Sequence, residues 1–226
     1  MLFGMAFSSG LAYWLFVGTL SESGAVREPI VRLNLGFEIL AAIQAMFLVP
    51  ALTMRQFSEE KRTGTLEVLL TAPVNEGTVV LSKFLGCWVF YMLCWLPAGL
   101  YLIALRVVGG APFDYLPLLS YYLALAVSGA AFLSMGLFFS SLTSNQVIAA
   151  VLTFAGMMFL LLTFVIRQMT LVAESVNAAL SRFDFLSQWR QALSGQLSVP
   201  DVLVYASLAT FGLFLTVKVL ETRRWA

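Results

Sequence analysis

The charged side chains of this chain are few, and five of them fall within residues 57–74, FSEEKRTGTLEVLLTAPV. Glu59 and Arg62 are three residues apart, so they can pair on one face of a helix. The stretch lies between two apolar segments that are each long enough to cross a bilayer. Its chemistry is therefore that of a charged surface held at the membrane boundary, where a partner in water can contact it.

The spacing within this stretch predicts two short helices. Gly64 interrupts the first helix, and Thr65 can cap the second one. Pro73 stops the second helix, which carries an apolar stripe of Leu66, Leu69 and Leu70. Asn75 can cap a further short turn. The alternative interpretation is an ordinary amphipathic loop that lies on lipid without a partner.

Motifs for catalysis are absent from the sequence. It contains no G-x-x-x-x-G-K-[ST], no HExxH, no CxxC and no GxSxG. It also has no histidine, which removes the usual general base and the commonest metal ligand. Cys87 and Cys94 are too far apart along a helix to form a disulfide. We therefore expect no catalytic residue, no bound cofactor and no metal in this chain.

The composition indicates an integral membrane protein. The chain is 60% hydrophobic and 11% charged, with a mean hydropathy of +0.90, whereas soluble domains are about 25% charged. A net charge of +1 gives no reason to expect nucleic acid as a partner. Apolar segments predict six transmembrane helices, at about 2–20, 33–54, 84–105, 118–139, 146–166 and 201–220.

Residues 167–200 differ from the other connections because apolar side chains recur in them at helical spacing, with charges between. They predict two short amphipathic helices that lie in or dip into the interface. Six spans place both termini on one side of the membrane. Counting Lys and Arg gives seven with the termini and six on the other face, so charge favours cytoplasmic termini only weakly.

Glu38 is the one carboxylate that falls clearly inside an expected span, and Asn34 shares its helical face. An ionisable group inside a membrane suggests a pathway or gate. The alternative is that Glu38 lies near the outer interface and pairs with Arg32 or Arg27. The fourth span has an unusually small-sided face, residues 128–136, which allows close helix contact within the bundle or between subunits.

The stretch KRTGTLEVLLTAPV, followed by SKFLG, resembles the cytoplasmic segment of ABC-2 type transporter permeases, whose pattern is E-x-x-x-G-T-x-E-x-L-L-x-x-P. The matching residues are Glu60, Gly64, Thr65, Glu67, Leu69, Leu70 and Pro73. MGLFFSSLTSNQVIAA (residues 135–150), FDFLSQWRQALSGQLSVPDVLVY and the terminal VKVLETRRW are similar to the gliding-motility and nitrous-oxide-maturation branch of that family.

The resemblance implies a single ABC-2 type transmembrane domain over residues 1–226. It would be all-α, with six transmembrane helices, a cytoplasmic coupling helix and short external re-entrant helices. It also implies a non-catalytic permease subunit of a bacterial exporter, located in the cytoplasmic membrane with both termini inside. The residues implied for ATPase coupling are Glu59, Glu60, Arg62, Gly64, Thr65, Glu67, Leu70 and Pro73.

The implied partners are a second permease protomer, identical or not, and a separate ABC ATPase subunit that holds ATP and magnesium. The lipid bilayer surrounds the complex, and an extracytoplasmic accessory protein is a further candidate partner. Family members usually begin with a basic elbow helix, whereas this chain starts almost directly in apolar sequence. We therefore expect that translation begins upstream of Met1, that the chain was cut, or that the elbow is absent.

A function from another class stays open, namely a secondary transporter or a membrane assembly scaffold. A secondary transporter would show inverted repeats and ionisable groups near the midplane, and the sequence shows neither. A scaffold would need no coupling segment.

Overall fold

A computed structural model describes residues 38–65, 75–109, 116–167 and 180–224, together with the isolated positions 10, 14 and 177. Over these residues the protein is all-helical, without strands. The helices are α3 (Glu38–Thr53), α4 (Ser58–Thr63), α6 (Glu76–Gly109), α7 (Leu116–Leu142), α8 (Gln146–Arg167), α10 (Phe185–Leu193) and α11 (Val199–Arg224).

Four helices of the described part, α6, α7, α8 and α11, are long and apolar enough to cross a membrane. They confirm an integral membrane protein built of helices. α3 has 16 residues, fewer than the roughly 20 that a span needs. The expected span at residues 2–20 lies outside the described residues except for Gly10 and Trp14. The count of six spans therefore stays a prediction.

The helix that contains the expected third span, residues 84–105, is longer than that span, because α6 begins at Glu76. Asn75 caps α6 itself rather than a separate short turn, since its Oδ1 accepts a hydrogen bond from the Gly77 N–H at 3.2 Å. An apolar run marks only the part of a helix that lies in hydrocarbon. The polar residues up to Lys83 extend the same helix beyond that part.

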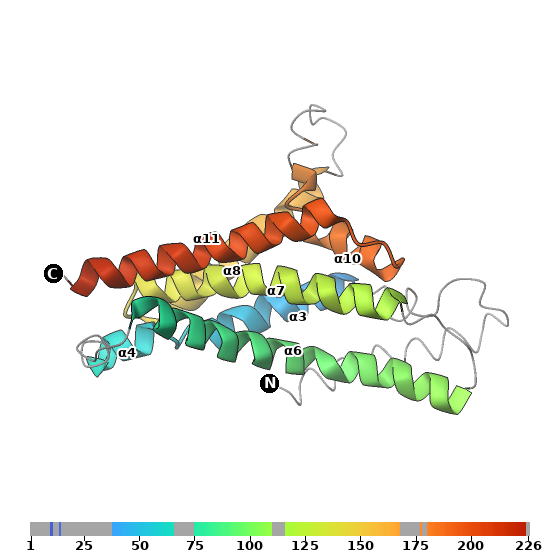
Figure 1. Ribbon diagram of the computed structural model, residues 1–226, viewed down its shortest axis with the longest axis horizontal. Helices are drawn as coiled ribbons and strands as arrows, with labels where there is room; N and C mark the ends of the chain where they lie inside the picture. Colours follow the sequence, from blue (N-terminus) through green and yellow to red (C-terminus); the bar gives the residue numbers. More distant parts are fainter. Residues whose placement is uncertain are drawn as a thin grey trace.

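The spans alternate in direction around α7, which lies between α11 and α6 in the view of Figure 1. α4, the start of α6 and the C-terminal end of α11 lie together at one end of the bundle, hereafter the α4 end. α10 lies toward the opposite end (Figure 1). The charged stretch and the amphipathic stretch predicted from the sequence are thus separated along the long axis of the bundle.

Small residues of α7 let its neighbours approach closely. A Cβ at Gly129 would overlap the ring of Tyr91 from α6, and a Cβ at Gly136 would overlap the side chain of Thr53 from α3. From α11, a Cβ at Gly212 would come within 2.6 Å of the Oγ of Ser134. The small-sided face of the fourth span is therefore used for contacts within this chain.

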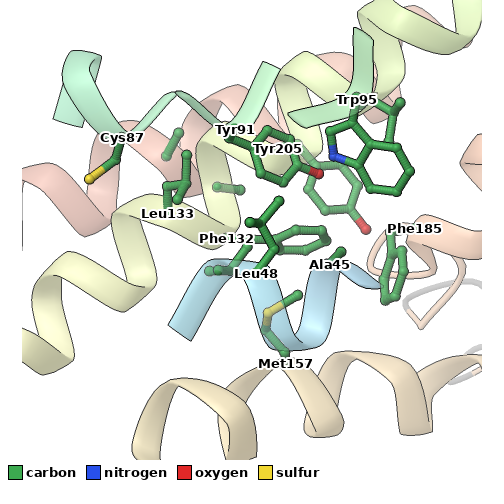
Figure 2. Packing of buried hydrophobic residues seen from close by; sticks show 14 of the residues in the cluster. Ala45, Leu48, Cys87, Tyr91, Trp95, Phe132, Leu133, Met157, Phe185 and Tyr205 are labelled. Carbon is green, nitrogen blue, oxygen red and sulfur yellow. The ribbon is translucent and has the colours of Figure 1, made fainter. Parts of the chain in front are cut away.

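Aromatic rings fill the core around α10 (Figure 2). Trp189 is fully buried, and its ring packs edge-on against Trp95 of α6, Tyr121 of α7 and Phe185 one turn earlier on α10. The Trp189 indole N–H donates to the Oγ of Ser128, near the middle of α7, at 3.0 Å. This hydrogen bond holds α10 deep in the bundle. α10 is one of the two short helices predicted within residues 167–200, and most of the other lies outside the described residues.

Both ends of α10 are capped by its own sequence. The Asp184 carboxylate accepts the backbone N–H of Ser187 at 3.1 Å, as an N-cap does. At the other end Gly195 has a φ of +77°. There the N–H of Gln196 donates to the Gln191 carbonyl, and that of Gly195 to the Ala192 carbonyl. This is a Schellman motif, in which a left-handed glycine closes the last turn.

We predict that Gly129→Ala destabilises the protein, because the added methyl group must displace the Tyr91 ring at a tightly packed contact. Overpacking of this kind costs about 1–3 kcal/mol. The measurement is the midpoint of thermal unfolding in detergent, followed by size-exclusion chromatography. Gly86→Ala is the matched control, since a Cβ there meets nothing within 4 Å and alanine favours a helix by up to about 1 kcal/mol. A Gly129→Ala midpoint equal to or above that of Gly86→Ala would contradict this account of the α6–α7 contact.

Candidate functional site

The chain leaves α3 through a short non-helical break, residues 54–57, and the hydroxyl of Ser140 closes that break. Ser140 lies on the last turns of α7 and is fully buried. Its Oγ accepts the backbone N–H groups of Phe57 at 3.1 Å and Ser58 at 3.2 Å. The same hydroxyl donates to the Met54 carbonyl at 3.2 Å. One side chain of α7 thus satisfies three backbone groups at the start of α4.

Phe57 and Lys83 fix the other side of this break. The Phe57 side chain is completely buried, and the ammonium of Lys83 lies 5.1 Å from the centre of its ring. Lys83 also donates to the Gln56 carbonyl at 2.6 Å. It forms an ion pair with the Glu60 carboxylate at 2.6 Å. Lys83 therefore connects the start of α6 to the break and also to α4.

α4 is further tied to the end of α7 by Lys61, whose ammonium donates to the Ser141 carbonyl. A lysine at this position offers a cation to the C-terminal carbonyl groups of α7, where the helix dipole favours positive charge. α4 is thus attached to two spans, α6 and α7, in addition to following α3 in the chain.

Gly64 ends α4 as the sequence predicts. Its φ is +74°, and its N–H donates to the Lys61 carbonyl at 3.4 Å. No atom lies within 4 Å of a Cβ placed there, so the conformation, and not space, selects glycine. The hydroxyls of Thr63 and Thr65 are 2.9 Å apart across this turn. The second helix predicted after Gly64 lies outside the described residues.

The outward surface of α4 is small and mixed in charge. Arg62, Thr63, Gly64 and Thr65 are exposed, and Glu59 is half-buried. Arg62 borders a polar hollow of about 380 Å³ beside the α7–α8 turn. Among the described residues, the carboxylate that forms an ion pair in this segment is Glu60, and no Glu59–Arg62 pair is seen.

The structure therefore brings together five of the eight residues implied for coupling: Glu59, Glu60, Arg62, Gly64 and Thr65. The other three, Glu67, Leu70 and Pro73, lie outside the described residues, as does Asn34. Glu38 is the first residue of α3, and only its backbone is described. Position 38 lies on the same face of that helix as Ala42 and Ala45, which are buried in the bundle.

The sequence analysis missed a buried polar cluster toward the opposite end of the bundle. Arg167, the last residue of α8, forms an ion pair with the N-cap Asp184 at 2.5 Å. The Asp184 side chain is only 2% exposed. The Arg167 Nε also donates to the Asn177 side chain at 3.0 Å. The signal available was Asp184 directly before the apolar residues of Phe185–Leu193, which is the position of an N-cap.

The sequence analysis also missed Ser140 and Lys83 as anchors of α4. A serine near a helix end carries no signal of a contact with a segment about eighty positions earlier. The described residues include no group of three or more His, Cys, Asp or Glu side chains that could hold a metal ion. What the geometry at the α4 end provides is a mechanical connection: a charged surface joined rigidly to membrane-spanning helices.

In a comparison with protein families, residues 29–192 fit the model described as an ABC-2 family transporter protein. A comparison with curated proteins gives no significant match. The matched region contains α3, α4, α6, α7, α8 and nearly all of α10, which is more than two thirds of the chain. The chain therefore belongs to the ABC-2 family of transporter proteins.

Proposed function

We propose that this chain is the membrane subunit of an ATP-driven exporter, in which α4 receives the stroke of a separate ABC ATPase. The observation that carries the proposal is the attachment of α4 to α7 by Ser140 and Lys61 and to α6 by the Glu60–Lys83 pair. A loop that merely lay on lipid would not need buried hydrogen bonds to a span 80 residues away in the chain. ATP and magnesium would be held by the partner.

In this mechanism two permease protomers expose a path alternately to each side of the membrane. Closure of the ATPase dimer displaces α4, and the displacement enters α3, α6 and α7 together. The route through α7 rests on the contacts that Ser140 and Lys61 make at the end of that helix. We place Asn34, Glu38 and the 167–200 segment at the outer gate or along the path.

The docking surface for the ATPase is formed by Glu59 and Arg62 and by Glu67 in the segment after Gly64. In that segment Leu70 anchors the second predicted helix to the bundle, and Pro73 ends it. Glu60 acts inside the permease because it pairs with Lys83. Residues 135–150 and the 183–205 segment favour the branch of gliding-motility and nitrous-oxide-maturation permeases. An accessory protein outside the cytoplasm would bind on the face that carries α10.

The alternative functions, secondary transport and scaffolding, give no role to the attachment of α4 to α6 and α7. The test that separates them is co-expression with the ABC ATPase encoded beside this chain. We expect a stable complex whose ATP hydrolysis depends on the permease. Failure of that ATPase, and of the other ABC ATPases of the host, to associate with the intact permease would overturn the proposal.

A topology prediction follows from the separation of α4 and α10. A cysteine at Thr63, the exposed last residue of α4, should be protected from an impermeant thiol reagent in intact cells. A cysteine at Ser194, which is exposed just after α10, should react. Ser58 is unsuitable as a position because it is fully buried. The native Cys87 and Cys94 are buried and contribute little background. The reverse pattern would place the α4 end outside the cell.

Charge reversal in α4 should distinguish residues that bind the ATPase from residues that stabilise the permease. Glu59→Lys with Arg62→Glu should weaken ATPase association about tenfold at unchanged thermal stability, since exposed charge pairs contribute up to about 1 kcal/mol each. Glu60→Lys should instead lower the stability of the permease, because it faces Lys83.

The matched control is the swap Glu60→Lys with Lys83→Glu, which restores opposite charges. It should recover part of the lost stability, a coupling of about 0.5–3 kcal/mol between neighbours. Association is measured by detergent pull-down over a range of ATPase concentrations, and stability by thermal unfolding. Equal loss of ATPase binding in Glu60→Lys and in Glu59→Lys with Arg62→Glu would refute this division of roles.

Ser140→Ala should uncouple α4 from α7. It leaves two buried N–H groups without an acceptor, at a cost of about 1–3 kcal/mol each, so the break between α3 and α4 should loosen. We expect the complex to assemble while permease-dependent stimulation of ATP hydrolysis falls. Ser144→Ala, at an exposed position in the α7–α8 turn, is the control. If Ser140→Ala assembles normally and still stimulates ATP hydrolysis normally, the contacts of the Ser140 hydroxyl do not transmit movement from the ATPase to the permease.

A further inference from the structure

An apolar groove of about 450 Å³ lies between α7, α8 and α11. Its volume is in the range of ligand pockets, about 300–1,000 Å³. The polar side chains that line it are Ser134, Thr163 and Tyr205. Their hydroxyls already donate within the protein, to the carbonyls of Ala131, Leu160 and Phe183 respectively. A water molecule would find few free partners there, so the groove suits a hydrocarbon guest.

The mouth of the groove faces the bilayer. Phe159 on α8 and Phe211 on α11 line it, and they are 68% and 58% exposed. Both belong to helices that are long and apolar enough to cross the membrane. The molecules that surround these two rings are therefore lipid chains, and the gap between the rings is open to them.

The groove lies around the middle of the α11 span. Along α11 it runs from Tyr205 to Leu215, which at 1.5 Å per residue is about 15 Å, and the whole span runs from Val199 to Thr222. An acyl chain that enters at the Leu215 end therefore reaches the middle of the bilayer inside the groove.

Opposite charges lie beyond the end of the groove nearest α4. Lys218 is one turn past Leu215, on the helical face that carries Phe211. Its ammonium lies 5.7 Å from the centre of the Phe214 ring and 2.6 Å from the Glu221 carboxylate. The Lys218 and Glu221 side chains are 54% and 39% exposed. An anionic group would meet attraction from Lys218 and repulsion from Glu221, whereas a headgroup with both charges satisfies both residues.

We infer that this groove is a binding site for one zwitterionic phospholipid of the leaflet at the α4 end. One acyl chain lies between Phe159 and Phe211, its phosphate contacts Lys218, and its ammonium contacts Glu221. The lipid fills the space between the groove-lining residues of α8 and α11. The site is separate from the docking surface on α4 and does not depend on the proposed function.

The test uses the full chain in nanodiscs of phosphatidylcholine that contain a small fraction of phosphatidylethanolamine with a diazirine on one acyl chain. After irradiation, mass spectrometry locates and quantifies the labelled residues. We expect labels concentrated on the groove segments of α8 and α11. Leu208→Trp and Leu215→Trp, which fill the groove from half-buried positions, should each reduce this labelling about tenfold, the factor expected when two methylene groups lose their contacts.

Leu203→Trp is the matched control, on the same helix but 63% exposed and outside the groove. It should leave the labelling unchanged. Labelling that is spread evenly over the exposed spans, or that survives both filling variants, would show ordinary annular lipid and overturn the site. Absence of lipid labels, together with cross-links between two copies at Phe211, would show that a second copy covers the groove, and would overturn it too.

Headgroup variants test the assignment of the polar end. Lys218→Gln should lower labelling by the phosphatidylethanolamine probe about fivefold, the factor for the roughly 1 kcal/mol that one lysine contributes at a membrane surface. Glu221→Gln should shift the preference toward a phosphatidylglycerol probe with the same chain. Equal labelling by both probes in the unchanged protein and in Glu221→Gln would refute the zwitterionic assignment.

Discussion

Hydrocarbon offers no hydrogen bonds, so every interruption of a helix in a membrane protein must satisfy its backbone groups from within the protein. The described chain solves this problem twice. After α3 the backbone groups that have no partner within the helix form hydrogen bonds with the Ser140 hydroxyl. Around α10, a helix of only nine residues, they find Asp184 at one end and the Gly195 turn at the other. Each short helix is therefore rigid relative to the spans, although each is joined to them by irregular backbone.

Both solutions draw on the same span. Ser140 of α7 holds the break before α4, and Ser120 of α7 donates to the Ala192 carbonyl of α10 at 2.6 Å. Twenty residues of helix separate these two serines, about 30 Å, which is the thickness of a hydrocarbon core. Ser128 lies between them and accepts the indole N–H of Trp189. α7 thus connects the two short helices α4 and α10 across the width of the membrane.

Sequence patterns predicted the features that depend on local chemistry. Gly64 ends α4, and the apolar spacing of residues 185–193 predicted α10, because both follow from the conformational preferences of neighbouring residues. Contacts between distant segments could not be predicted. Nothing in the sequence near Ser140 points to Phe57, and Lys83 looked like a residue at the edge of a span rather than the partner of Glu60. The start of α6 was missed because hydropathy measures where lipid begins, not where the helix begins.

The length of α6 has a mechanical consequence. Its 34 residues extend over about 51 Å, well beyond the hydrocarbon core, and Figure 1 shows it projecting past α7 at the end far from α4. A transmembrane helix whose apolar stretch is longer than the hydrocarbon core reduces the difference in length by tilting. Because Lys83 fastens its first turns to α4, a change in tilt of about 5° there would move the far end by roughly 4 Å. The end of the protein far from α4 would then move with α4 without any change in the packing between them.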